Sequence, residues 1–345
     1  MRGVDIETIV RRFALAGGLM ATLGIAQYVT RQSLVDRIAI PGLTASYESG
    51  TNFRNGLIRV AGTATHPIEF GALLTILLPI ALHVALHSHG LGRFRRWFPA
   101  ATIFVALGLS GSRSAYIGLV VVLVVLLLGW PRRLRMVVGP TSVVVLVLMC
   151  LALPPLFRSV RNMFVGAKDD PSIASRTDSY AIAVQFVERW PFFGHGLGTF
   201  LPKYRVFDNA YLGLLVSVGI VGTIAFVAIP VTAIWLLLRR RRLWIDERSR
   251  DLALSLAAGI AAGSVSLAFF DGFGFPMMMG TMLLTLGISG ALLAVRGRSQ
   301  LPPPDWWPPS GRAEPRHASQ DPVELPVPRA HGDQSGVLSD GSRAP

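Results

Sequence analysis

The stretch PIEFGALLTILLPIALHVAL, residues Pro67–Leu86, decides the fold. Glu69 near its start and His83 near its end are its only titratable side chains, and the rest is almost entirely apolar. An α-helix rises about 1.5 Å per residue, so about 20 such residues cross the roughly 30 Å hydrocarbon core of a bilayer. The stretch therefore predicts a membrane-spanning helix.

Seven further apolar blocks, flanked by Arg, Pro or Gly, extend this prediction to the whole chain. They are Phe13–Val29, Trp97–Leu109, Ser114–Trp130, Met136–Phe157, Ala210–Leu238, Leu252–Phe270 and Met277–Val295. We expect the short block Trp97–Leu109 to be broken or tilted. Of the 345 residues, 51% are hydrophobic and only 15% charged, which excludes an ordinary cytosolic enzyme. The expected fold class is all-α: a polytopic integral membrane helical bundle of about eight transmembrane helices with a large ordered extracytoplasmic loop.

The charge pattern gives the orientation. The net charge is +13, and the arginines gather in alternate connections. These basic segments hold Arg2, Arg11 and Arg12; Arg93, Arg95 and Arg96; Arg132, Arg133 and Arg135; Arg239–Arg242; and Arg296 and Arg298. Arginine-rich short loops stay on the cytoplasmic side, so an inner (plasma) membrane protein with both termini in the cytoplasm is predicted. This topology accounts for most of the charge, and we expect no nucleic-acid partner.

The expected domain organisation has two parts. Residues 1–296 form the polytopic membrane domain, and its outer loop covers residues 158–207. Residues 297–345 are rich in Pro, Ser and Gly and cannot bury enough apolar surface to fold, so a disordered cytoplasmic tail is predicted. The single cysteine, Cys150, excludes an intrachain disulfide and a cysteine-based metal site.

Arginines on the outer side point to an anionic ligand. Arg113 lies between two apolar blocks, and Arg176 and Arg205 lie in the outer loop, where the positive-inside rule would select against them. A guanidinium can bind a phosphate bidentately and keeps its charge at any relevant pH. For Arg113 the alternative is an anchor that reaches lipid headgroups. Asp208 and Asn209 open a span at the same boundary, and Asp208 is either a helix N-cap or a group with a catalytic role.

Four stretches in this order resemble the O-antigen ligase and O-antigen polymerase family of bacterial membranes. They are Thr65-His66-Pro67 with Glu69-Phe70-Gly71; Ser110-Gly111-Ser112-Arg113-Ser114-Ala115; Ser175-Arg176-Thr177-Asp178 with Trp190–Phe200; and Asp208–Leu212 with Gly219-Ile220-Val221-Gly222. The resemblance covers about residues 63–222.

The resemblance implies a metal-independent glycosyltransferase of surface-polysaccharide biosynthesis in the cell envelope, without cofactor. A glycan on undecaprenyl pyrophosphate would pass to an acceptor glycan or glycolipid, on the outer face. Arg113 and Arg176 would hold the pyrophosphate and stabilise the charge that develops as the glycosidic bond breaks. Asp208 would complete the catalytic set. Substrate-binding candidates are Arg205, Asn209, His195 and His66, and no metal ligand is expected.

Several alternatives stay open. The ligase branch has a His-Asn-x-x-Leu pattern where this chain has Asp208-Asn209-Ala210-Tyr211-Leu212, so ligation and polymerisation fit equally well. A lipid-linked glycan transporter or flippase would use the same arginines, although it would need polar groups across the bilayer midplane. A non-catalytic short form of the family is the third possibility. His83, His87 and His89 are predicted to be interfacial anchors rather than metal ligands.

Overall fold

The structure, a computed structural model, describes residues 3–32, 35, 52–54, 57–88, 92–152, 171–196, 198 and 207–298. The predicted tail from residue 299 on, and residues 158–170, 197 and 199–206 of the predicted outer loop, lie outside these ranges. All of the described residues belong to the unit Met1–Leu301.

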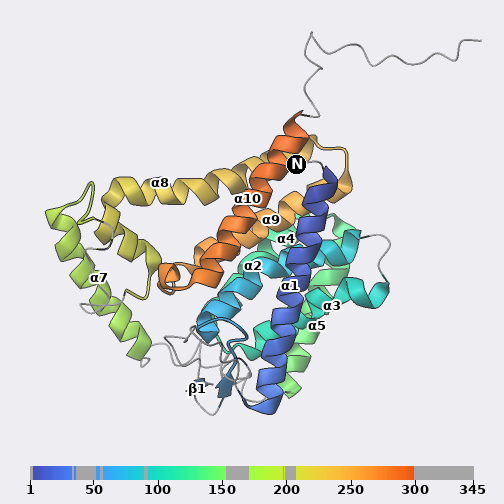
Figure 1. The fold of residues 1–345 in the computed structure, drawn as a ribbon, viewed down its shortest axis with the longest axis horizontal. Coiled ribbons are helices and arrows are strands. Elements are labelled where there is room, and N and C mark those ends of the chain that lie inside the picture. The colour runs from blue at the N-terminus through green and yellow to red at the C-terminus, as the bar shows by residue number, and fades with distance from the viewer. Residues whose placement is uncertain are drawn as a thin grey trace, which may run out of the picture. The chain divides into compact units, whose positions relative to one another are not determined.

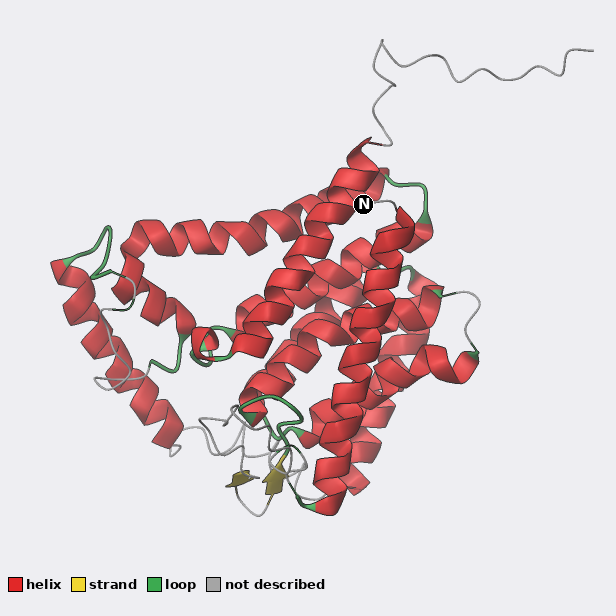
Figure 2. Cartoon of the chain, viewed as in Figure 1, coloured by secondary structure: helices red, strands yellow, loops and turns green. Residues whose placement is uncertain are grey.

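Each of the eight apolar blocks falls wholly or largely on a helix of the described chain (Figures 1 and 2), although residues 153–157 lie outside the described ranges and the block Leu252–Phe270 extends past the end of its helix at Ser266. The helices are α1 (Gly3–Thr30), α2 (Pro67–His87), α3 (Arg93–Leu109), α4 (Arg113–Gly129), α5 (Arg132–Ala152), α8 (Ala210–Arg240), α9 (Glu247–Ser266) and α10 (Pro276–Arg298). A further helix, α7 (Pro171–Arg189), lies in the outer loop, and two short 3₁₀ turns, η1 (Arg241–Leu243) and η2 (Gly272–Gly274), join the last helices. The block Trp97–Leu109 belongs to one continuous helix.

Four segments of the described chain are long and apolar enough to cross a bilayer: Ile6–Thr30, Pro67–His87, Ala210–Leu243 and Pro276–Arg296. Large apolar side chains are also exposed on helix faces. On α5, Val144, Val147, Leu148 and Leu151 are exposed at three- and four-residue spacing. A stripe of this kind on the outside of a helix fits lipid rather than water. The chain is therefore a helical membrane protein.

Helix α2 forms the centre of the bundle. Nearly all of its side chains are buried, and it packs against α1, α3, α4, α9 and α10. Small residues permit the close approaches. A Cβ atom on Gly71 would lie 2.6 Å from the Cβ of Ala115 in α4, and one on Gly259 in α9 would lie 2.7 Å from the carbonyl oxygen of Ile76. Small residues at helix contacts are the usual packing solution in membranes, because lipid offers no hydrophobic gain for association.

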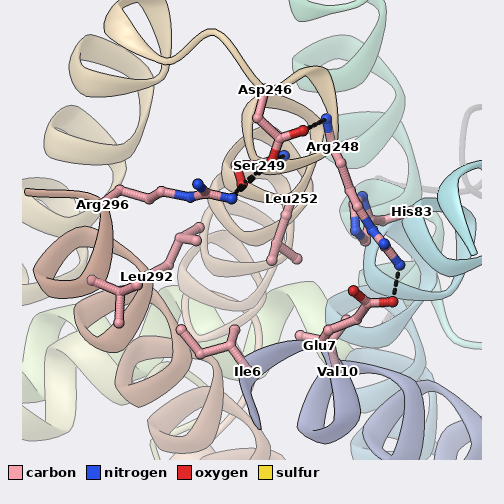
Figure 3. Close-up of a pocket in the computed structure, with 11 residues that line it drawn as sticks. Ile6, Glu7, Val10, His83, Asp246, Arg248, Ser249, Leu252, Leu292 and Arg296 are labelled. Atoms are coloured by element: carbon pink, nitrogen blue, oxygen red, sulfur yellow. Dashed lines mark hydrogen bonds and ion pairs between the residues drawn. The ribbon is translucent and has the colours of Figure 1, made fainter. Parts of the chain in front are cut away.

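One end of the bundle is held by ion pairs between helix termini. Glu7 of α1 pairs with Arg248 of α9, and Asp246, the N-cap of α9, pairs with Arg296 of α10 at 2.8 Å (Figure 3). With Ile6, Val10 and His83 these groups border a small cavity of about 70 Å³. The start of α1, the end of α2, the start of α9 and the end of α10 therefore meet at the end that the arginine pattern assigns to the cytoplasm.

Helix α8 bends at a glycine, and the loop that follows α7 packs against the backbone at this bend. Gly219 has φ 66° and ψ −168°, and the two parts of α8 meet there at an angle (Figure 1). The chain makes a tight turn after Trp190, in which Gly194 N donates to Trp190 O at 3.1 Å. Four backbone hydrogen bonds seat this loop in the bend: His195 N to Val216 O, Gly196 N to Ser217 O, Ile220 N to Pro191 O and Val221 N to Phe192 O.

Helix α7 packs on the first part of α8. Ala183 is buried with Val216, and Phe186 and Val187 cover them. Helix α7 therefore lies within the outer loop and supplies the apolar side chains that cover this part of α8. The all-α prediction omitted a short antiparallel hairpin of β1 (Asn52–Arg54) and β2 (Leu57–Arg59), in which Phe53 lies opposite Ile58.

Candidate functional site

The turn between α3 and α4 places Arg113 at the first position of α4. Gly111 takes φ 59°, a left-handed conformation that suits glycine. Serines hold the rest of the turn: Ser110 Oγ donates to Leu107 O at 2.8 Å, and the hydroxyls of Ser112 and Ser114 lie 2.9 Å apart. These serines are buried while Arg113 is only half-buried. The sequence Ser-Gly-Ser-Arg-Ser therefore builds a rigid turn that presents one guanidinium group at a helix start.

Arg59, a residue that the sequence did not single out, lies beside this turn. Its side chain is only 8% exposed, and a Cβ atom on Gly111 would lie 3.5 Å from Arg59 Cγ. A second guanidinium group is thus brought close to the start of α4. The available signal was its place in a segment that the predicted topology puts outside the cytoplasm, where the positive-inside rule disfavours arginine.

His66 caps the adjacent helix α2. Its Nδ1 accepts a hydrogen bond from Ile68 N at 3.2 Å, and its ring stacks on Phe275 with centroids 5.9 Å apart. Burial and the charge of Arg59 lower the pKa of His66, although Glu69 opposes them. A neutral ring with Nδ1 as acceptor carries its proton on Nε2. His66 can therefore donate a hydrogen bond to a ligand, but it cannot accept a proton at Nδ1 without losing the cap.

Glu69 joins α2 to α10 through a fully buried carboxylate. Oε2 accepts from Thr65 N at 2.9 Å and Thr65 Oγ1 at 2.8 Å, and Oε1 accepts from Met277 N at 2.8 Å and Met278 N at 3.3 Å. Charge-assisted bonds to the amides at a helix start are favourable, since the positive end of the helix dipole adds to them. Glu69 is therefore a structural clamp at this end of the bundle.

Replacing Glu69 by Gln should destabilise the bundle by about 2–3 kcal/mol, because the amide group brings N–H donors against backbone donors. The measurement is thermal unfolding of the purified protein in detergent, followed by helical circular dichroism. The control is Glu188→Gln on α7, a carboxylate that takes no part in this clamp. An equal midpoint for Glu69→Gln and Glu188→Gln would contradict the assignment.

The start of α8 corrects one interpretation of the sequence. The N-cap is Asn209 rather than Asp208: Asn209 Oδ1 accepts from Tyr211 N at 3.0 Å and Leu212 N at 3.3 Å. Its Nδ2 donates to the hydroxyl of Tyr180 in α7 at 3.2 Å. Asp208 is half-buried just before the cap, and no described residue donates a hydrogen bond to its carboxylate. Two adjacent residues were both good caps, and the start of the helix at Ala210 decides between them.

A continuous line of contacts links the start of α8 to the start of α4. Ala210 N donates to Leu267 O at 2.9 Å and to Phe270 O at 3.1 Å. Phe270 packs on Phe275 with centroids 5.5 Å apart, and Phe275 stacks on His66. His66 lies near enough to Arg59 for the guanidinium charge to lower the pKa of the imidazole, and the Arg59 side chain borders Gly111. One end of the bundle therefore carries Arg113, His66 and the Asp208-Asn209 pair.

The other predicted site residues are placed only in part. Arg176 belongs to α7, one turn before Tyr180, and its side chain lies outside the described residues. Arg205 also lies outside them. His195 packs edge-on against Phe186 and Trp190, with centroids 5.4 and 6.4 Å away, in the loop that seats in the bend of α8. The structure thus brings His195 to the far end of the first part of α8 rather than next to Asn209.

A comparison with known protein families shows which family the central region of the chain resembles. The family model of O-antigen ligase matches residues 98–227. This region is O-antigen ligase-related. No curated protein matches the chain. The match confirms the resemblance inferred from the sequence motifs and indicates a glycosyltransferase-like role in polysaccharide assembly.

The O-antigen ligase-related region contains most of the predicted site. It runs from α3 through α4, α5 and α7 to the middle of α8, and so includes Arg113, Arg176, Asp208 and Asn209. His66 precedes it, as does Arg59. The helix α2 and the hairpin nevertheless contribute to the same end of the bundle, because His66 and Arg59 lie beside groups of the matched region.

Proposed function

We propose that this chain is a membrane glycosyltransferase of surface-polysaccharide assembly. It transfers or polymerises a glycan from a polyprenyl-pyrophosphate donor on the extracytoplasmic face. The eight blocks span the cell inner membrane, both termini are cytoplasmic, and residues 297–345 form a cytoplasmic tail beyond the membrane domain 1–296. The family match and the alternation of basic connections support this arrangement.

The observation that carries the proposal is the gathering of cationic and helix-start groups at one end of the bundle. Arg113 begins α4, and Arg59 lies against the preceding glycine. The first amides of a helix and a guanidinium group both favour an anion. The opposite end is closed by ion pairs between helix termini. A diphosphate whose polyprenyl tail stays in lipid suits the first end.

In this proposal Arg113 and Arg176 hold the pyrophosphate. The acceptor hydroxyl oxygen attacks the anomeric carbon, and the bond from that carbon to the phosphate oxygen breaks. The leaving polyprenyl pyrophosphate keeps the electron pair, and its charge is stabilised by the two guanidinium groups. Asp208 accepts the hydroxyl proton as general base. Because arginines supply the positive charge, the step as proposed needs no metal.

The remaining groups bind and position substrate. His66 offers its Nε2 proton, and Arg205 contributes from the outer loop. His195, at the far end of the first part of α8, would contact a part of the glycan remote from the pyrophosphate. Asn209 acts mainly through position, because its amide oxygen caps α8 and its nitrogen reaches Tyr180. That bond supports the proximity of Arg176 to the start of α8, since Arg176 is one helical turn from Tyr180.

The test is a reaction with purified components. The chain in detergent is mixed with a polyprenyl-pyrophosphate oligosaccharide and candidate glycan or glycolipid acceptors, and released polyprenyl pyrophosphate is measured. We expect release that depends on acceptor and matches the amount of glycan transferred. Movement of the intact donor across a proteoliposome membrane without release would instead indicate a transporter. Absence of both release and movement with every acceptor would indicate a non-catalytic member of the family.

A further inference from the structure

Two histidines and an aspartate meet at the other end of the bundle, away from the candidate transferase site. His83 and His87 are four residues apart near the end of α2, so they lie on one helix face. Their rings stack with centroids 5.1 Å apart. Asp251 comes from the first part of α9: its Oδ2 is 2.7 Å from His83 Nδ1 and 3.2 Å from His87 Nδ1. His83 is therefore not an interfacial anchor, since it is only 3% exposed.

A third helix fixes the carboxylate. Trp130, which ends α4, donates from Nε1 to Asp251 Oδ1 at 2.7 Å. This leaves Oδ2 directed at the two imidazoles, and Asp251 itself is only 7% exposed. Groups that orient a ligating carboxylate in this way are characteristic of the surroundings of metal sites.

The donor set and its spacing suit a transition-metal cation. One ligand atom from each of the three side chains lies within 4.8 Å of the others. Zinc binds imidazole nitrogen and carboxylate oxygen at about 2.0–2.2 Å, which separates tetrahedral ligands by about 3.3 Å. The distance from His87 Nδ1 to Asp251 Oδ2 is already 3.2 Å. The distance from His83 Nδ1 to the same oxygen is 2.7 Å, so these two atoms would have to move apart by about half an ångström. His87 Nδ1 is buried, and its 3.2 Å contact with Asp251 Oδ2 lacks good hydrogen-bond geometry, so a cation between the two atoms would satisfy both.

We propose that His83, His87 and Asp251 bind one divalent transition cation of the zinc type. The cation joins the end of α2 to the start of α9, and through Trp130 to the end of α4. A cavity of about 270 Å³ borders His87 and Asp251 and gives the cation an entry path and room for a fourth ligand. Arg135, Arg241 and Arg250 line the same cavity, so the fourth position favours water or a small anion.

The alternative is a hydrogen-bonded His–Asp cluster that holds the helices together without metal. Sequence spacing could not decide this, because Asp251 lies far from both histidines along the chain. The proposal is also independent of the transferase, since its readout is metal binding.

The test uses the full chain in detergent, purified with a histidine-free tag, stripped with chelator and reloaded with Zn²⁺. After desalting, metal content is measured by mass spectrometry. We expect about one zinc per chain for the wild type, and at least about tenfold weaker zinc binding in His87→Ala and Asp251→Asn, since each loses one of three ligands. His195→Ala, which removes a histidine from the outer loop, should keep the wild-type metal content.

A second measurement does not depend on variants that could misfold. Cobalt added to the stripped wild type should give the visible absorption of a low-symmetry site with nitrogen ligands, and zinc should displace it. Wild-type protein that holds no zinc after reloading would overturn the proposal. Equal zinc content in the wild type, His87→Ala and Asp251→Asn would overturn it as well.

Discussion

Arg113→Ala should reduce the release of polyprenyl pyrophosphate by about 100-fold or more at unchanged protein level, because one guanidinium group that stabilises the leaving charge is lost. Arg113 is the residue best placed for this role, at the first position of α4 in a turn that serines and Gly111 hold rigid. The loss should fall mainly on kcat/KM. Arg113→Lys should retain part of the activity, since an ammonium group keeps the charge but not the bidentate geometry.

The matched control for this prediction is Arg133→Ala. Arg133 is an exposed arginine at the start of α5, in the connection assigned to the cytoplasmic side. Arg133→Ala should leave the rate of polyprenyl pyrophosphate release unchanged. If Arg113→Ala released polyprenyl pyrophosphate at the wild-type rate, Arg113 would be only a lipid-headgroup anchor, and the phosphate role would be wrong.

Gly219→Ala should have the largest effect on stability, a loss of at least about 3 kcal/mol. At φ 66° and ψ −168° this position lies in a region of backbone space that is essentially restricted to glycine. A Cβ atom there would also overlap the backbone of Phe192. Gly194 faces the same contact, where a Cβ atom would lie 2.6 Å from Gly219 N. The substitution therefore expels the loop from the bend of α8, together with its four backbone hydrogen bonds.

The effect is measured as the midpoint of thermal unfolding in detergent, with Gly213→Ala as the control in the same helix. A Cβ atom on Gly213 meets nothing within 4 Å, so this change should be neutral or stabilising by up to about 1 kcal/mol. Equal midpoints for Gly219→Ala and Gly213→Ala would show that the loop is not seated in the bend.

The positions of the helices were predictable from the sequence because apolar blocks of membrane length leave few alternatives. Lipid cannot satisfy exposed backbone groups, so such a block becomes a helix whatever its neighbours are. The turn at Trp190–Gly194 was likewise predictable from its local Pro and Gly pattern. The bend at Gly219 was not, because it depends on a loop that returns from another part of the chain.

The parts of the site that escaped prediction depend on long-range contacts. The position of Arg59 depends on the packing of its side chain against Gly111, which lies far from it in the sequence. Glu69 was seen as a charge near a span end, but its partners Met277 and Met278 are distant in sequence. In the same way, Asp251 joins His83 and His87, two predicted interfacial anchors, in one cluster in which His83 and Asp251 are buried and His87 is half-buried. Local patterns predict helices and turns, whereas these pairings follow from how the helices pack.

The central claim is that a diphosphate binds where α4 begins. The most direct measurement is a cryo-electron microscopy map of the full chain with bound polyprenyl pyrophosphate. We predict density for the diphosphate within hydrogen-bonding distance, about 3 Å, of the guanidinium groups of Arg113 and Arg176, at the end of the bundle that holds His66 and Asn209. A diphosphate at the opposite end near Asp251, or these two guanidinium groups too far apart to share one diphosphate, would contradict the account.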